Sequence, residues 1–186
     1  SIYALLFIVL LAPCIGLSRT AGYFNVKGKL SAISAVGSAV LNFTWVQDQD
    51  DYKILINHFL GSFSARIEGN QSFVTLWLSN QKEPIYSTRP NELIQKYFGF
   101  TLPILSMKHW IRGEANPSMP WSFEGERNRR QYSIEQSNWS IKYLVYMKNL
   151  PSDIGLDLVP KKFTIQSENT KIKMFIKYWN LTAPVN

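Results

Sequence analysis

The residue types that most often carry enzyme chemistry are scarce in this chain. It contains two histidines, His58 and His109, and a single cysteine, Cys14. Hydrolases need a nucleophile beside a base, and metal sites need several ligands at fixed spacing. The sequence has no H-E-x-x-H or C-x-x-C pair, no phosphate-binding loop and no G-x-S-x-G turn. His109 is therefore interpreted as a residue of a helix face, and we predict no enzyme activity, no cofactor and no metal site.

Cys14 is the one residue whose position indicates a chemical modification. It follows an apolar run, residues 2–11, which has the length of a signal-peptide core and is shorter than the roughly 20 residues needed to span a bilayer. The run and the cysteine resemble the lipobox of bacterial lipoproteins, although Pro13 replaces its usual small residue and no Lys or Arg precedes the run. We expect Cys14 to be diacylated and to begin the mature chain, followed by Ile15. The alternative is a buried, inert thiol.

The rest of the chain is predicted to be one domain behind a short tether. Residues 15–25 have small side chains, one charge and no clear period, as linkers often do. Residues 26–186 show no repeat and no shift in composition, and their number suits a single domain. The chain as a whole is 46% hydrophobic, so this domain can bury a core.

A predicted hairpin over residues 52–69 has an unusual tip. Apolar and polar residues alternate on both sides of it, as in strands with one buried face. Hairpin tips usually carry Asn, Asp, Gly or Pro, whereas Phe59 and Leu60 precede the glycine here. Either this apolar pair folds back under a neighbouring element, or it stays exposed and meets a membrane or a lipidated partner.

The wider pattern predicts a mainly β fold with a few helices. Strands joined by short turns occupy residues 26–78 and 123–178, so neighbouring strands are expected to be antiparallel. Within the second range, residues 148–160, with Pro151 and Pro160, are predicted to form a loop. Helical spacing with Pro and Gly at the ends appears instead over residues 88–99 and 101–113. We expect a curved antiparallel sheet, an incomplete barrel, whose open side is covered by these short helices.

The apolar faces of these strands are candidates for an apolar cavity. Because every second side chain of a strand points to the same face, the position of a residue along its strand (its parity) predicts whether it points inward. The residues predicted to point inward are Phe43, Trp45, Ile54, Ile56, Phe63, Ile67, Trp139, Ile141, Tyr143, Ile165, Met174 and Ile176. If their side chains do not fill the concave side, they line a cavity for an apolar ligand. The alternative is a fully packed core, and composition does not separate the two.

The chain is basic, with 20 Lys and Arg against 13 Asp and Glu. Arg127, Arg129 and Arg130 cluster in a predicted turn, and lysines alternate with apolar residues over residues 171–177. Nucleic acid is one partner for such a chain, but the export signal argues against it. The lysines are interpreted as a solvated outer face, or as a surface that attracts anionic headgroups or an acidic carrier.

The order of motifs resembles the LolB family of outer-membrane lipoproteins over residues 26–180. The matching residues, in chain order, are Gly28-Lys29-Leu30, Trp45, Leu60-Gly61, Glu92-Leu93, Gly99-Phe100-Thr101-Leu102-Pro103, His109-Trp110-Ile111-Arg112-Gly113, Trp139, Tyr143, Tyr146, Pro160 and Trp179. The resemblance implies an incomplete barrel with a hydrophobic cavity for acyl chains, and a protruding loop with an exposed leucine at Leu60.

The resemblance also implies a function without covalent chemistry. A LolB-like protein accepts lipoproteins from the periplasmic carrier LolA and inserts them into the outer membrane. We therefore expect a monomer anchored through Cys14, facing the periplasm, whose partners are LolA, lipoprotein acyl chains and outer-membrane lipid. Ile15 after the cysteine fits outer-membrane sorting. The alternatives are a lipid-anchored structural or assembly protein with a full core and, less well supported, a lipid hydrolase.

Overall fold

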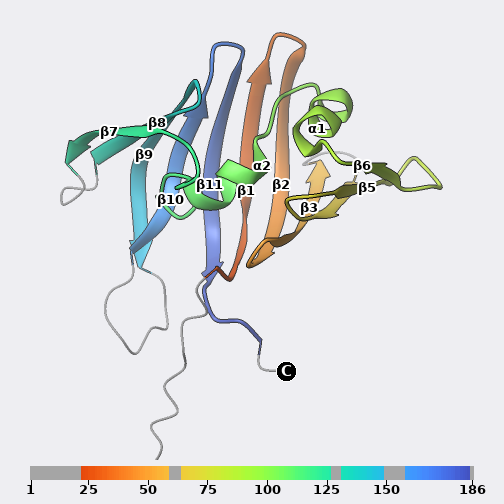
Figure 1. Ribbon diagram of the computed structural model, residues 1–186, viewed down its shortest axis with the longest axis horizontal. Coiled ribbons are helices and arrows are strands. Elements are labelled where there is room, and N and C mark those ends of the chain that lie inside the picture. Colours follow the sequence, from red (N-terminus) through yellow and green to blue (C-terminus); the bar gives the residue numbers. More distant parts are fainter. Residues whose placement is uncertain (1–21, 59–63, 127–130, 149–157, 185–186) are drawn as a thin grey trace, which may run out of the picture.

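The computed structural model describes residues 22–58, 64–126, 131–148 and 158–184, and these form one curved sheet with two short helices on one side (Figure 1). The elements in chain order are β1 (Phe24–Ser34), β2 (Gly37–Asp48), β3 (Asp51–His58), β4 (Ser64–Gly69), β5 (Val74–Leu78), β6 (Ile85–Ser87), α1 (Pro90–Phe98), α2 (Ile104–Trp110), β7 (Trp121–Glu126), β8 (Gln131–Gln136), β9 (Trp139–Lys148), β10 (Leu158–Gln166) and β11 (Thr170–Asn180).

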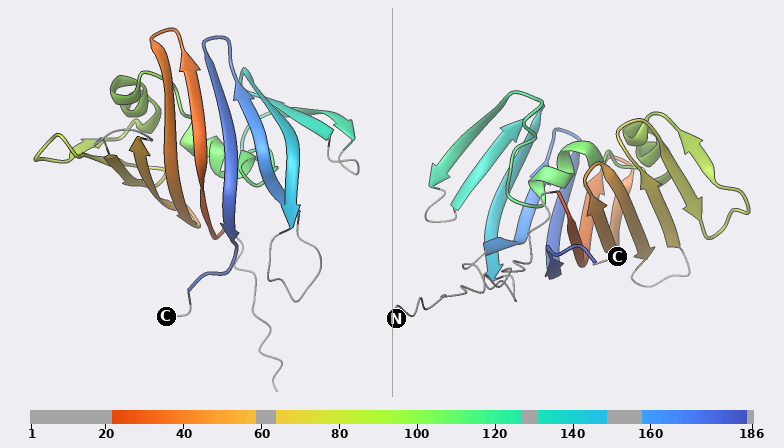
Figure 2. Two further views of the ribbon diagram at one scale, coloured as in Figure 1. Left: turned by 180° about the vertical axis from the view of Figure 1, so that it is seen from behind. Right: turned by 60° about the horizontal axis from the view of Figure 1, so that its bottom comes forward.

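The sheet consists of two meanders joined at its centre. In the described residues its 11 strands run in the order β6-β5-β4-β3-β2-β1-β11-β10-β9-β8-β7, and each strand is antiparallel to its neighbours. The first and last strands, β1 and β11, therefore lie side by side. The two halves of the sheet, the wing of β1–β6 and the wing of β7–β11, curve toward each other. The helices α1 and α2 lie between the two wings on the concave side (Figure 2). This confirms the predicted open, curved antiparallel sheet covered by short helices.

The strands form because apolar residues recur at every second position. In β3, Tyr52, Ile54 and Ile56 are buried while the residues between them are exposed. The same alternation in β11 buries Ile172, Met174 and Ile176 against exposed lysines. Successive side chains of a strand point to opposite faces, so this alternation gives the sheet one apolar face and one polar face.

α1 begins and ends as predicted, whereas α2 ends at Trp110, before the predicted end at Gly113. Pro90 is the first residue of α1, where its missing N–H costs nothing, and Gly99 ends the helix with a φ of 75°. Pro103 precedes α2, and Gly113 adopts a φ of 81° beyond its end. Among the described residues, neither helix is long and apolar enough to cross a membrane.

The structure corrects two predicted boundaries and adds one strand, β6. β1 extends into the segment predicted as a tether, and Tyr23 and Phe24 are buried because Phe24 packs on Trp45 and Trp179. β6 has only three residues, too few to show alternation. β10 begins at Leu158 rather than beyond Pro160, because a register irregularity follows the proline and lets the strand accommodate it.

Candidate functional site: the concave face and its helical cover

The concave face is built from rows of buried side chains that run across the strands. In one row Val26 of β1 is paired with Trp45, then Ile54, Ile67 and Leu76 of the next strands, and all five are buried. Side chains opposite each other on antiparallel strands point to the same face. The row therefore forms a continuous apolar surface from β1 to β5.

A second row crosses the other wing. Ala32 of β1 is paired with Ile172, then Ile165, Ile141 and Ile134, which takes the row through β11, β10 and β9 to β8. All of these side chains are buried. Both rows start at β1, so the apolar surface extends without interruption over both wings.

The structure places most of the predicted cavity residues on this face. The buried ones are Phe43, Trp45, Ile54, Ile56, Ile67, Ile141, Tyr143, Ile165, Met174 and Ile176. Trp139 is only partly buried, since it begins β9 beside the β8–β9 turn, yet it packs against the core and against Trp110 at a ring distance of 6.1 Å. Phe63 lies outside the described residues, as do Cys14, Phe59, Leu60 and the arginines 127, 129 and 130.

The two helices supply the other side of this interior. Leu93 and Ile94 of α1 are buried, as are Ile104, Met107 and Trp110 of α2. They belong to the same hydrophobic cluster as the strand residues. An apolar molecule could therefore occupy the concave face only by displacing these helix side chains.

A buried polar network fixes the C-terminal end of α2 to the wing of β8 and β9. Tyr143 donates its hydroxyl proton to the carbonyl oxygen of Trp110 at 2.7 Å, and Trp110 Nε1 donates to Gln136 Oε1 at 2.9 Å. Gln136 Nε2 donates in turn to the carbonyl oxygen of Asn116 at 2.8 Å. A buried polar group that loses its partner costs free energy, so this network resists movement of α2.

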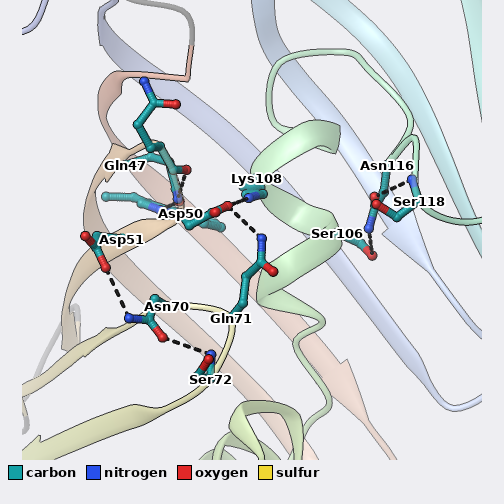
Figure 3. A network of polar contacts seen from close by, with 12 residues as sticks. Gln47, Asp50, Asp51, Asn70, Gln71, Ser72, Ser106, Lys108, Asn116 and Ser118 are labelled. Atoms are coloured by element: carbon teal, nitrogen blue, oxygen red, sulfur yellow. Dashed lines mark hydrogen bonds and ion pairs between the residues drawn. The ribbon is translucent and has the colours of Figure 1, made fainter.

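On the opposite wing an ion pair at the surface joins α2 to the β2–β3 turn. Lys108 Nζ lies 2.8 Å from Asp50 Oδ1 in the β2–β3 turn, and Gln71 Nε2 of the β4–β5 turn donates to the same oxygen at 2.8 Å (Figure 3). The hydrogen bonds from Lys108 and Gln71 lower the pKa of Asp50. The Lys108 and Asp50 side chains are 16% and 58% exposed. An ion pair that is open to solvent on one side contributes less to stability than a fully buried network, so α2 is held more firmly at Gln136 than at Asp50.

Two titratable side chains of the site have shifted pKa values. His109 lies half-buried on α2, and burial, followed by the charge of Lys108, lowers its pKa. The hydroxyl of Tyr52 is buried without a hydrogen-bond partner in the described structure, and burial raises its pKa to about 12. Within the part of the chain that the structure describes, no group of three or more His, Cys, Asp or Glu could hold a metal ion.

The polar residues that hold the two helices in place were not among the predicted site residues. The inward orientation of Gln136 was predictable from the sequence. It lies two and four residues after the buried Ile134 and Tyr132 on the same strand, so its side chain points to the same face. For Asp50 and Lys108 there was no such indication. They are far apart in the chain, and only the packing of α2 brings them together.

Comparison with known proteins agrees with this architecture. A family model described as "Outer membrane lipoprotein LolB" matches residues 23–179. The chain is 26% identical over 156 residues to the outer-membrane lipoprotein LolB of Coxiella burnetii, covering 84% of this chain and 71% of that protein. It is 29% identical over 161 residues to the LolB of Cellvibrio japonicus, covering 85% and 77%.

Among solved structures, the fold is similar to that of a putative outer membrane lipoprotein-sorting protein domain from Vibrio parahaemolyticus. The TM-score is 0.51 at 8% sequence identity, and the likeness covers 90% of this chain and 91% of that one. At such low identity the likeness concerns the fold alone.

Proposed function

Because the chain belongs to the LolB family of outer-membrane lipoproteins, we propose that it accepts lipoproteins from the periplasmic carrier LolA and inserts them into the outer membrane. The acyl chains of the cargo lie against the concave face, beneath α1 and α2. The observation that supports this proposal is the continuous apolar surface of that face, which two short helices cover. The protein acts as a monomer.

Transfer of this kind needs no covalent chemistry and no nucleotide. Each methylene taken out of water is worth about 0.8 kcal/mol, so acyl chains leave an apolar shelter for water very slowly. Movement from a carrier to the concave face, and from there into a bilayer, exchanges one apolar surrounding for another. Direct contact at each step avoids the cost of exposing the chains to water.

The helices that cover the concave face, α1 and α2, must move before acyl chains can enter. Met107 and Trp110 of α2 are at most 1% exposed, so they fill space that a ligand needs. Since α2 is held less firmly at Asp50 than at Gln136, we propose that it lifts from the β2–β3 side. The apolar surface beneath it then becomes accessible.

Cys14 is proposed as the lipid anchor that places the domain on the periplasmic side of the outer membrane. We expect mass spectrometry of the protein purified from membranes to find a diacylated Cys14 as the first residue, followed by Ile15. An unmodified Cys14, or cleavage at another position, would show that the anchor is wrong while leaving the function of the domain open.

Photo-crosslinking tests the concave face directly. A photoreactive amino acid at Ile56 or Ile141, both buried, should capture lipoprotein during transfer. Each has a matched neighbour of opposite parity, the exposed Leu55 and Lys142, which should capture none. Capture only from Leu55 and Lys142 would refute the assignment of the acyl-binding face.

A lipid-anchored structural or assembly protein is the second candidate. The observation that favours it is the close filling of the interior, in which Ile67, Trp110 and Ile141 are 0% exposed. Uptake of a fluorescent fatty acid separates the two functions. A saturable rise in fluorescence that Ile56→Asp or Ile141→Asp abolishes supports acyl-chain binding, and no rise at any concentration supports the structural role.

A further inference from the structure

The tip of the β1–β2 hairpin exposes a cluster of aliphatic side chains. Ile33, Val36 and Val40 are 48%, 79% and 46% exposed. Ala32 and Leu41 are buried, so Ile33 and Val40 must project from the outer face of the sheet, and Val36 lies in the turn between the strands. Single exposed aliphatic residues are common, but three at one hairpin end form a patch that marks a contact surface.

The structure holds this tip in place. The hydroxyl of Ser34 donates to the carbonyl oxygen of Gly99 at 2.9 Å, which ties the hairpin to the C-terminal end of α1. Val36 also packs closely over Gly99, because a Cβ at that glycine would lie 2.8 Å from Val36 Cγ2. The aliphatic cluster is therefore presented at a fixed position and pays little ordering cost on binding.

Lysines of β11 flank the cluster on the same outer face. Lys171 is paired with Ile33, and Lys173 with Ser31, which is in turn the partner of Val40. Both lysines are exposed. The three adjacent strands β1, β11 and β10 contain no Asp or Glu. The acid of the β10–β11 turn, Glu168, lines a pocket together with residues of β8, β9 and β10, on the side away from β1.

We infer that this tip is a second membrane-contact site, at which Ile33, Val36 and Val40 enter the boundary of an anionic phospholipid bilayer while Lys171 and Lys173 bind lipid phosphates. Aliphatic side chains next to lysines are the pattern of surfaces that lie in the headgroup region. The cluster lacks the aromatic and arginine anchors that protein interfaces favour, and it lies at a projecting hairpin end rather than in a groove (Figure 1).

The position of the tip agrees with delivery to a membrane, and the inference rests on the proposed function in this respect. β3 ends at His58, which is paired with Leu41, the neighbour of Val40. The β1–β2 and β10–β11 hairpins also meet at this end, where Ser34 is paired with Thr170. β3 therefore ends toward the same end of the sheet as the tip.

Depth-dependent fluorescence quenching tests the inference in the full, membrane-anchored chain. An environment-sensitive dye is attached at Val36→Cys, and the protein is reconstituted in vesicles that contain phosphatidylglycerol and brominated phospholipids. The dye should be quenched and its emission shifted to the blue. The control is Ser72→Cys, an exposed position in the β4–β5 turn at the opposite end of the sheet, where the dye should stay unquenched.

The charge of the lysines is tested with the same dye. Lys171→Gln combined with Lys173→Gln should reduce the fraction of quenched protein, with the equilibrium for insertion falling roughly fivefold for each lysine removed. Lys177→Gln is the matched control on the same strand, since Lys177 lies at the opposite end of β11, and it should change nothing. Vesicles of phosphatidylcholine alone should behave like the double variant.

The results at positions 36, 72 and 56 test the second contact site and the proposed function separately. Equal quenching at positions 36 and 72 would overturn the inference, and so would a dye at position 36 that responds only when an acidic protein is added, which would indicate protein docking. If Ile56 captures acyl chains but position 36 is not quenched, only the second contact site is wrong. If position 36 is quenched but no inward residue captures acyl chains, the proposed function is wrong.

Discussion

We propose that delivery to the membrane depends on Leu60, the residue that the family resemblance assigns to a protruding loop. It follows Phe59 directly after β3. Burying a leucine side chain in an apolar environment is worth about 1.5–3 kcal/mol, whereas a charged side chain costs about 2.5–3.5 kcal/mol at the centre of a bilayer. We therefore expect Leu60→Glu to accept lipoproteins from the carrier at the normal rate and to fail in transferring them to vesicles.

Leu60→Ile and Leu60→Phe provide the controls, because both retain the apolar surface and should retain delivery. Thermal unfolding followed by circular dichroism should show that Leu60→Glu leaves the fold intact. Normal delivery by Leu60→Glu would mean that the tip plays no part in release. Loss of the fold would mean that Leu60 belongs to the core.

Gly28 allows β1 and β11 to approach each other closely at one point of the sheet. It lies at the register irregularity between β1 and β11, where a Cβ would collide with the backbone oxygen of Phe175 and lie 3.1 Å from a ring carbon of Phe43. Gly28→Ala should therefore lower the free energy of unfolding by about 1–3 kcal/mol, as overpacking does. Urea denaturation measures this loss, and Ser31→Ala on the same strand should change stability by less than about 0.5 kcal/mol. Equal stability of the two variants would show that the strands can separate at this point without cost.

The weaker attachment of α2, at Asp50, predicts how the helices move away from the concave face. Asp50→Asn removes the charge that holds Lys108 and leaves the buried network at Gln136 intact. We expect this variant to take up a fluorescent fatty acid several-fold faster than the unchanged protein in stopped-flow measurements, because the weak end of α2 is released. The free energy of unfolding should change by less than about 1 kcal/mol, as is usual for an ion pair at the surface.

Asp51→Asn is the matched control for this element. Asp51 is the next residue in the same turn, but it accepts a hydrogen bond from Asn70 at 3.3 Å rather than from α2 (Figure 3). The substitution removes the same charge and should leave the uptake rate unchanged. Equal acceleration by both variants would attribute the effect to the charge of the turn and not to the attachment of α2.

The elements also show what the sequence could and could not reveal. Long strands with strict alternation, such as β3 and β11, were predictable because burial of one face fixes a period of two. Of the twelve residues that the same parity selected, ten are buried, whereas Trp139 is partly buried and Phe63 lies outside the described residues. β6 is too short to have a period, and β10 contains Pro160, which normally excludes a strand interior. The contact of Lys108 with Asp50 depends on the packing of distant segments, which no local pattern encodes.

Because the sheet is open, its two wings can move apart and enlarge the interior between them. The edge strands of the described sheet are β6 and β7, and no pairing joins them within the described residues. The wings can therefore separate without breaking backbone hydrogen bonds between strands, so the cost of opening falls on the contacts of α1 and α2. β7 carries exposed Glu124 and Glu126, and charges on an edge strand discourage pairing with another sheet.

The pH dependence of global stability should report the packing of α2 on this sheet. In the folded protein, burial and then the charge of Lys108 lower the pKa of His109 below its ordinary value of 6.5, and these effects outweigh the opposing charges of Glu114 and Asp50. Below about pH 6.5 the unfolded chain therefore binds a proton more readily than the folded protein. The free energy of unfolding must then fall as the pH decreases through this window.

His109→Gln removes this contribution. Urea denaturation at about pH 7.5 and about pH 5.5 should show that the original protein loses more stability between the two values than the variant does. The carboxyl of Asp50 does not disturb this comparison, because its pKa is lowered from 3.8 and its own contribution is lost only at more acidic pH. An identical loss in both proteins would mean that His109 is as accessible in the folded state as in the unfolded chain, and that α2 already stands away from the sheet in solution.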